Sequence, residues 1–146
     1  MKLLIITLTV LSSFFTKPTY ASDDVSPVVL KAFAQSFTAA KDVSWTSSKT
    51  FYKATFELND QYVSAFYNEE GELIAVTRNV TALQMPAVLQ AELKKDYTSY
   101  WITDLFEITN EQGTYYYVTL ETADSKIVLK STSFNKWSTY KKSQKS

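Results

Sequence analysis

The chain has 146 residues, with 15 lysines and arginines against 15 aspartates and glutamates, and it contains neither histidine nor cysteine. This composition excludes Ser-His-Asp and Cys-His nucleophiles and any zinc site built from nitrogen or sulfur ligands. Its two glycines cannot form a glycine-rich phosphate loop, and its balanced charge gives no electrostatic footprint for nucleic acid.

Residues 1–21, MKLLIITLTVLSSFFTKPTYA, have the pattern of a secretory signal peptide. A short basic start is followed by an apolar run from Leu3 to Phe15, and Thr19 and Ala21 stand at the small-residue positions of a cleavage site. The alternative is a membrane anchor, but the run is shorter than the roughly 20 apolar residues that a spanning helix needs. We expect cleavage after Ala21, no stable membrane insertion afterwards, and a single domain over residues 22–146 in the periplasm or outside the cell.

The first elements after this segment are predicted to be one helix and four strands. Ser26 and Pro27 are typical of a helix start, and apolar residues follow at helical spacing from Val29 to Phe37. The strand-like runs that follow are separated by the turn sequences ND and NEEG, which favour hairpins. These runs are Asp42–Ser47, Phe51–Leu58, Gln61–Tyr67 and Glu72–Asn79.

The second half of the chain has the same predicted order. Pro86 leads into a helix whose apolar stripe is Leu89, Leu93, Tyr97 and Tyr100. The predicted strands are Ile102–Asn110, Thr114–Thr122, Lys126–Thr132 and Trp137–Lys141.

Two sequence matches indicate an internal repeat. TFYKATFEL, from Thr50, lies over TYYYVTLET, which begins 64 residues later, and PVVLKA, from Pro27, lies over PAVLQA, which begins 59 residues later. We therefore predict two repeats, about 26–80 and 81–142. The predicted fold class is α+β: a tandem duplicated unit of one helix plus a four-stranded antiparallel meander, with the helices packed on one face of the sheet.

Side chains alternate along a strand, so each strand has an apolar face and an opposite face. Tyr52, Ala54 and Phe56, which lie over Tyr116, Val118 and Leu120, are expected to face the helices. The fourth strands are ambiguous, because Leu73 aligns with Trp137 while Ile74 and Val76 align with Ser138 and Tyr140.

The opposite face mixes aromatic and charged side chains in both halves. Aromatic residues with polar neighbours are typical of interaction surfaces, although cross-strand aromatic pairs also stabilise a sheet that has no partner. The candidate binding face consists of Phe51, Lys53, Tyr62, Phe66, Tyr115, Tyr117, Lys126 and Lys130.

These motifs give the chain a family likeness. It resembles the PepSY-like, or β-lactamase-inhibitor-like (BLIP-like), periplasmic domains of Bacteroidetes over nearly all of residues 22–146. The residues that carry the resemblance are Pro27, Phe33, Phe37, Val43, Trp45, Tyr52, Ala54, Phe56, Tyr67, Asn68 and Gly71, with Met85-Pro86 beginning a weaker second copy. The resemblance implies helices packed on a sheet and no catalytic residues. The β-lactamase inhibitor that lends the family part of its name binds its enzyme with a concave sheet face. It also has disulfides, which this chain cannot form because it has no cysteine.

The leading hypothesis is a non-enzymatic binding module, in its narrower form a protein-binding inhibitor, that uses the aromatic face to hold a protein partner. No cofactor or metal and no nucleic acid is expected to bind. One alternative is a small-ligand carrier with a cavity of about 300 Å³ or more between helices and sheet. Another is a hydrolase using Glu57 and Glu121 as acid and base, which requires their carboxyls to lie roughly 5–10 Å apart. The sequence does not indicate the partner or the oligomeric state.

Overall fold

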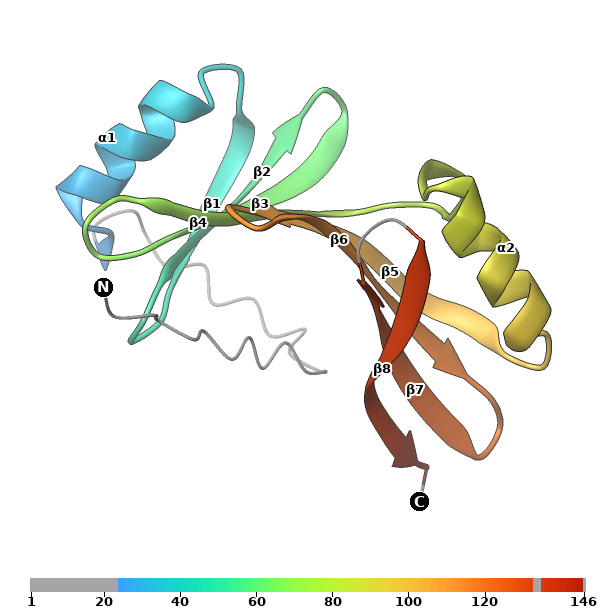
Figure 1. The fold of residues 1–146 in the computed structure, drawn as a ribbon. Helices are drawn as coiled ribbons and strands as arrows, with labels where there is room; N and C mark the ends of the chain where they lie inside the picture. Colours follow the sequence, from blue (N-terminus) through green and yellow to red (C-terminus); the bar gives the residue numbers. More distant parts are fainter. Residues whose placement is uncertain (1–23, 133–134, 146) are drawn as a thin grey trace.

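The computed structural model describes residues 24–132 and 135–145, so the predicted signal peptide lies outside the described residues. In the described part of the chain, two α-helices and a short 3-10 helix accompany one eight-stranded antiparallel sheet (Figure 1). The elements, in chain order, are α1 (Pro27–Ser36), β1 (Lys41–Ser47), β2 (Tyr52–Leu58), β3 (Gln61–Tyr67), β4 (Leu73–Asn79), η2 (Ala82–Gln84), α2 (Ala87–Asp96), β5 (Trp101–Asn110), β6 (Gly113–Glu121), β7 (Ser125–Thr132) and β8 (Lys136–Gln144).

Helix α1 begins at a proline, which has no backbone N–H and therefore needs no hydrogen-bond acceptor in the first turn. Pro27 is its first residue, and the carbonyl of Ser26 accepts the Leu30 N–H at 3.0 Å. Val29 and Phe33, one helical turn apart, are buried against the sheet. The N–H of Phe37 donates to the Phe33 carbonyl and ends the helix.

Helix α2 has the same plan, but its register differs from the predicted one. Its buried residues, Leu89 and Leu93, lie 60 positions after Val29 and Phe33 rather than 59. Pro86 precedes this helix as its N-cap, whereas Pro27 is the first residue inside α1. Aligning the two prolines therefore shifted the predicted helix match by one residue.

The β2–β3 and β3–β4 hairpins have tight turns that require positive φ angles. In the β2–β3 turn, Asn59 and Asp60 have φ angles of 52° and 61°, as in a type I′ hairpin. In the β3–β4 turn, Gly71 has φ 81° and its α-carbon lies against α1, because an added Cβ would stand 2.8 Å from Val28 Cγ1. These turns keep β2, β3 and β4 adjacent, and the strand order of the whole sheet is the order of the strands in the sequence.

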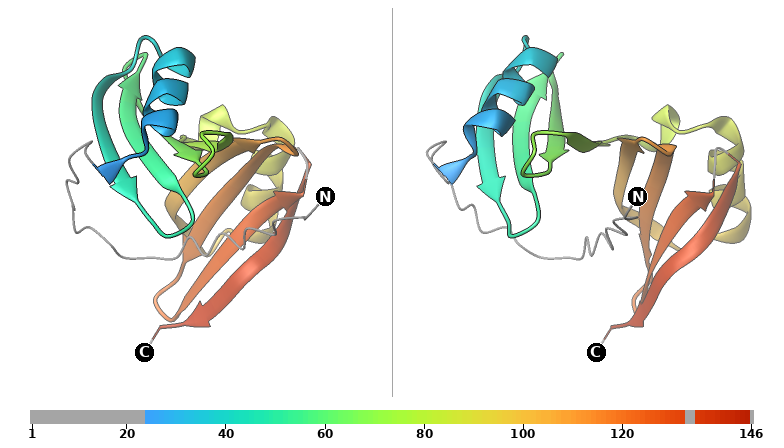
Figure 2. Two further views of the ribbon diagram at one scale, coloured as in Figure 1. Left: turned by 90° about the vertical axis from the view of Figure 1, so that its left-hand side faces the viewer. Right: turned by 60° about the vertical axis from the view of Figure 1, so that its left-hand side comes forward.

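The predicted fold class is wrong in one essential respect: the strands do not form a separate four-stranded meander with each helix. β4 pairs with β5 from Ala75↔Asn110 to Asn79↔Phe106, so the sheet continues through all eight strands (Figures 1 and 2). An internal repeat predicts the helix and strands within each unit, but it does not predict how the edge strand of one unit pairs with the edge strand of the other. Because an unpaired strand edge offers free N–H and C=O groups, the two edges satisfy each other.

Two hydrophobic cores lie on one face of this sheet, one under each helix. The register Phe56↔Val63↔Arg78↔Glu107↔Tyr116 places all five side chains on the same face, so both helices cover that face. The core under α1 consists of Val25, Val29, Phe33, Trp45, Ala54, Phe56, Val63, Ala65 and Tyr67. The core under α2 consists of Val80, Met85, Leu89, Leu93, Leu105, Tyr116, Val118, Leu120, Ile127 and Leu129.

Between the two cores, the junction of β4 and β5 carries a bidentate ion pair. Arg78 Nε and Nη2 donate to Glu107 Oε1 and Oε2 at 2.8 and 3.1 Å, and Tyr116 Oη donates to Glu107 Oε2 at 3.1 Å. The hydrogen bond from Arg78 lowers the pKa of Glu107 despite the opposing effect of burial. This pair lies between Val63 of the core under α1 and Tyr116 of the core under α2, and it connects the two halves of the sheet.

Candidate binding face

The sheet face opposite the helices is the inner side of an arch, which we call the concave face. Figure 1 shows α1 and α2 on the outer side of the bent sheet. Cross-strand register places Lys53 beside Phe66, and Tyr117 beside Lys130, on strand positions that alternate with the core residues. All eight residues of the predicted binding face therefore lie on the side of the sheet away from the helices, although several are half-buried rather than fully exposed.

The first half contributes a small aromatic group to this face. Phe51 and Phe66 meet edge to face with their ring centroids 5.5 Å apart, and Lys53 Nζ lies 5.7 Å from the Phe66 centroid. Tyr62 lies near the start of β3, opposite Glu57 on β2, and is 65% exposed. The predicted residues of this half thus form one group of three residues, Phe51, Lys53 and Phe66, and one separate, solvent-facing ring.

The second half contributes a larger group, the tyrosine cluster, centred on Tyr117. Phe106 stacks on Tyr117 with an interplanar angle of 6° at 5.1 Å, and Tyr140 meets Tyr117 edge to face at 5.4 Å. Lys130 Nζ lies 4.7 Å from the centroid of Tyr115 and 5.6 Å from that of Tyr117. The tyrosine cluster is therefore Phe106, Tyr115, Tyr117, Lys130 and Tyr140, drawn from four adjacent strands.

The pKa of the Tyr117 hydroxyl is raised above its ordinary value. Burial raises the pKa of its hydroxyl, and the nearby Tyr140 and Tyr115 raise it further. The Tyr115 hydroxyl donates to the Gln112 carbonyl at 3.1 Å. The cluster is thus an ordered apolar surface with hydroxyl groups at its rim, and Lys130 is its only cation.

The far end of the concave face, at the start of β5 and the end of β8, carries an ion-pair network around Glu121. Lys145 Nζ and Lys126 Nζ lie 2.6 and 3.5 Å from its carboxylate oxygens, and the Thr103 hydroxyl donates to it at 3.1 Å. The Lys145 hydrogen bond is the main cause of the lowered pKa of Glu121. Lys126, predicted as a contact residue, is therefore already partnered within the chain.

Sequence reasoning missed Phe106 and Tyr140. Phe106 follows the buried Leu105, which lies 60 residues after the buried Trp45, so the corrected helix separation would have identified Phe106 as facing the other side. Tyr140 stands at an irregularity between the pairs Val128↔Lys141 and Leu129↔Thr139. Simple alternation along β8 fails at such a point, because a bulge shifts the side-chain parity by one residue.

The geometry does not support the proposed carboxylate pair of a hydrolase. Glu57 is on β2 and Glu121 on β6, four strand steps apart, which at about 4.8 Å per step is roughly 19 Å along the sheet. Glu121 is also occupied by two lysines. In addition, no cluster of acidic side chains that could hold a metal ion occurs within residues 24–132 and 135–145.

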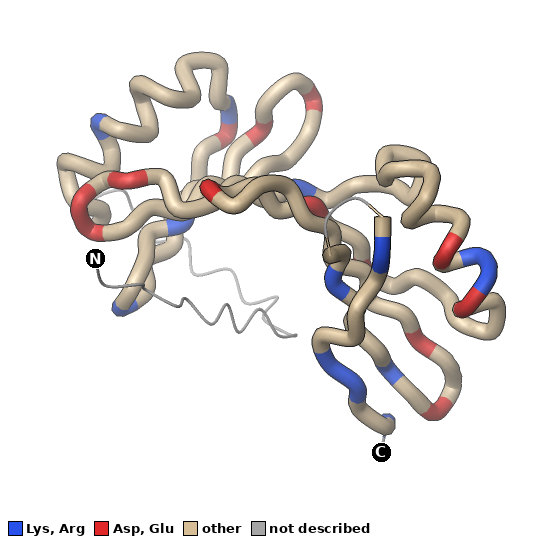
Figure 3. Tube along the Cα trace, in the orientation of Figure 1, with Lys and Arg blue, Asp and Glu red and all other residues tan. Residues whose placement is uncertain are grey.

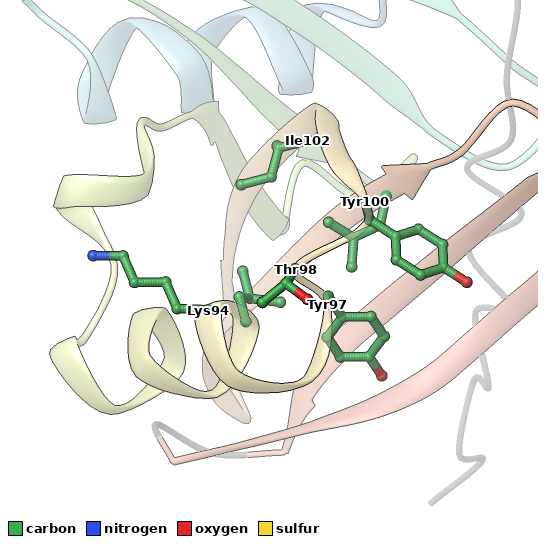
Figure 4. A pocket seen from close by; sticks show the side chains of 7 residues that line it. Lys94, Tyr97, Thr98, Tyr100 and Ile102 are labelled. Carbon is green, nitrogen blue, oxygen red and sulfur yellow. The ribbon is translucent and has the colours of Figure 1, made fainter.

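A pocket of about 290 Å³ opens at the C-terminal end of α2. Its lining residues are Leu93, Lys94, Tyr97, Thr98, Tyr100, Ile102 and Leu120. Figure 4 shows the Lys94 side chain pointing away from Tyr97 and Tyr100. Ligand sites usually enclose about 300–1,000 Å³ and combine an apolar lining with a few convergent polar groups. This pocket is at the lower limit of that size and its lining is mostly apolar, so it gives little support to the small-ligand carrier.

Sequence comparison matched the chain to no family model and to no curated protein. None of the helices in the described ranges is long and apolar enough to cross a membrane. The PepSY-like part of the sequence resemblance stays a prediction.

Solved structures do match the chain in three dimensions. A BLIP-like protein from Bacteroides fragilis matches with a TM-score of 0.70 and 17% identity, over 82% of this chain and 86% of that protein. A DUF2874 family protein from Bacteroides ovatus matches with a TM-score of 0.71 and 17% identity, over 82% of this chain and 87% of that protein. A protein from Bacteroides eggerthii, described provisionally as periplasmic, matches with a TM-score of 0.70 and 14% identity, over 82% of this chain and 88% of that protein. The chain therefore shares the fold of BLIP-like and DUF2874 family proteins of Bacteroides, and the BLIP-like resemblance is confirmed at the level of fold.

Proposed function

We propose that this chain is a non-enzymatic binding module of the periplasm or the extracellular space, and that it holds a protein partner on its concave face. The observation that carries the proposal is the tyrosine cluster, an ordered group of four rings and one lysine on the sheet face opposite α1 and α2, which no helix of residues 24–132 and 135–145 covers. Aromatic side chains fixed by their neighbours lose little entropy on binding, and such residues dominate the energetics of protein interfaces.

The orientation of the rings favours a protein over a carbohydrate. A sugar-binding platform presents the flat faces of its rings to solvent. Here the face of Tyr117 is stacked on Phe106, and Lys130 lies over both Tyr115 and Tyr117. These contacts occupy ring faces on which a sugar would stack, and the mixture of rings, hydroxyl groups and one ammonium group suits the mixed apolar and polar surface of a folded protein.

The shared fold also supports a binding role. The neighbour from Bacteroides fragilis is named BLIP-like, and the β-lactamase-inhibitor-like resemblance of the sequence implies binding to a protein. A protein-binding inhibitor is the narrower form of our proposal. The predicted signal peptide, together with the provisional periplasmic description of the Bacteroides eggerthii neighbour, supports a location in the cell envelope or beyond it.

The test is affinity capture of a partner from the native envelope with the wild-type chain and with a Tyr115→Ser/Tyr117→Ser variant. We expect the serine variant to lose capture, because it removes two of the four rings of the cluster. A matched Tyr115→Phe/Tyr117→Phe variant keeps the rings and should retain most of the capture. Leu83→Ser, at a residue that is 85% exposed on η2, controls for the loss of exposed apolar area elsewhere.

Thermal unfolding of each variant separates binding from stability. Cross-strand aromatic pairs contribute roughly 0.2–1 kcal/mol each, so the serine variant should remain folded with a modestly lower melting temperature. Undiminished capture by a folded serine variant would remove the concave face from consideration.

A further inference from the structure

The C-terminal hairpin concentrates positive charge. Residues 125–145 contain six lysines and no acidic residue, although the whole chain is electrically balanced. Figure 3 shows these lysines along β7 and β8, on one side of the molecule. They are Lys126, Lys130, Lys136, Lys141, Lys142 and Lys145. The concave face is therefore locally basic next to the tyrosine cluster.

Register shows which of these lysines share the face with the aromatic rings. Lys130 pairs with Tyr117, Lys141 with Val128 and Lys136 with Thr132, and these positions alternate along β7 with the core residues Ile127 and Leu129. Lys142 instead pairs with Ile127, on the helix side. Three lysines thus share the concave face with the rings, and Lys130 contacts two of them.

These three lysines have no carboxylate partner within the described residues. Glu121 is engaged by Lys126 and Lys145, whereas Lys130, Lys136 and Lys141 form no salt bridge in the described part of the chain. Lys130 is held over two rings instead. An ammonium group in that position is attracted to the ring faces and is fixed before any partner arrives.

We propose that the concave face binds an acidic protein surface, with partner carboxylates opposite Lys130, Lys136 and Lys141 and partner apolar side chains on the tyrosine cluster. This inference rests on the proposed function and adds the chemistry of the partner. Complementary charge at an interface increases the association rate and excludes wrong partners, while the aromatic contacts supply affinity.

The residues on this face fit carboxylates better than the phosphates of a nucleic acid or a lipid. Arginine is the usual residue for bidentate phosphate binding, and the only arginine of the chain, Arg78, is paired with Glu107 on the helix side. Glu121 and Asp104 also lie on the concave face, because Glu121 pairs across the strands with Lys126 and Asp104 pairs with Thr119. Their negative charges oppose a continuous polyanion but leave room for separate carboxylates next to the lysines.

The test is a titration of the full, ¹⁵N-labelled chain with two synthetic peptides, followed by NMR. The peptides have the same length and the same leucine and tyrosine residues, alternating with glutamate in one and with lysine in the other. We expect the glutamate peptide to shift the amide signals of Tyr115, Tyr117 and Lys130, and to lose affinity as salt is added. The lysine peptide should leave these signals in place.

Charge-removing variants locate the effect. Lys130→Gln/Lys141→Gln should weaken binding of the glutamate peptide roughly threefold to tenfold, as expected for exposed ion pairs. Lys94→Gln/Lys95→Gln removes the same charge from exposed positions on α2 and should leave the affinity unchanged.

The outcomes distinguish this inference from the proposed function. Equal shifts with both peptides would overturn the acidic partner but keep the concave face as a binding surface. No shift at the tyrosine cluster with either peptide would count against both. Stronger binding to inorganic polyphosphate or to vesicles of phosphatidylglycerol than to the glutamate peptide would overturn a protein partner in favour of a phosphate-bearing one.

Discussion

At the scale of single residues, the three consecutive tyrosines show how alternation along one strand divides structural from surface roles. Tyr116 is 6% exposed in the core under α2, its N–H donates to Ser131 Oγ and its hydroxyl donates to Glu107. Tyr115 and Tyr117 point to the other side and meet Lys130. A substitution at Tyr116 would therefore affect folding, whereas substitutions at its two neighbours test binding.

Two features of the structure require a glycine at position 71: its positive φ angle and its close contact with α1. Its φ of 81° disfavours other residues, and a Cβ would stand 2.8 Å from Val28 Cγ1 and 3.2 Å from the Val28 carbonyl oxygen. We expect Gly71→Ala to lower the free energy of unfolding by about 2–3 kcal/mol, as measured by urea denaturation.

Gly113→Ala is the matched control for Gly71→Ala. Gly113 also has a positive φ, 122°, but nothing lies within 4 Å of a Cβ added there. Gly113→Ala should therefore lower the free energy of unfolding by about 1 kcal/mol, which is the cost of the backbone strain alone. Equal losses in the two variants would mean that the β3–β4 turn moves away from α1 without cost.

Single residues could be assigned from the sequence where strands are regular. The buried Ala54 and Phe56, and their counterparts Val118 and Leu120, were assigned to the helix-facing side because alternation is unbroken along β2 and β6. Tyr140 could not be assigned, because the irregularity in β8 depends on cross-strand packing that the local sequence does not encode.

At the scale of elements, the junction of β4 and β5 matters most, and it is the part of the fold that sequence reasoning missed. Strand positions follow from local pattern and turn residues, so β1 to β7 lie within one residue of their predicted bounds. The pairing of β4 with β5 joins segments separated by η2 and α2, and neither strand signals its neighbour. The long-range match between Arg78 and Glu107 is visible only once that pairing is known.

The Arg78–Glu107 pair makes part of the stability depend on pH. Because its folded-state pKa is lowered from 4.5, Glu107 stabilises the fold above that value and loses this contribution as the pH falls through the folded pKa. We expect wild type to lose about 1 kcal/mol more unfolding free energy than Glu107→Gln between about pH 7 and about pH 3. The difference is small because the Arg78 side chain is 36% exposed, so that solvent screens the ion pair.

A double-mutant cycle isolates the Arg78–Glu107 pair from other titrating groups. Arg78→Gln should flatten the pH dependence as Glu107→Gln does, and the combined variant should add little to either. Urea denaturation at each pH supplies the free energies. Additive losses in the combined variant would show that the two residues act independently of each other.

At the scale of the whole molecule, the concave face belongs to neither half alone. Phe66 and Lys53 lie on one side of the β4–β5 junction, and the tyrosine cluster contributes from β5 onwards on the other. The two cores share no residue within the described chain, so the arch is maintained by the β4–β5 ladder and by the Arg78–Glu107 pair. The shape offered to a partner therefore depends on a narrow connection between two separately packed halves.

Because the core is divided, a truncation in one core should reduce the protection of backbone amides against hydrogen exchange more in its own half than in the other half. Phe56 and Leu129 are each 0% exposed, one in each core, and truncation of such residues to alanine costs about 2–5 kcal/mol. In hydrogen exchange followed by mass spectrometry, Phe56→Ala should speed exchange in β1–β3 more than tenfold beyond its effect on β6–β7, and Leu129→Ala should do the reverse. Each variant is the control for the other. If both accelerated exchange equally in the two halves, the ladder of five residue pairs between β4 and β5 would couple the halves into one cooperative unit, and the concave face would be rigid across its whole width.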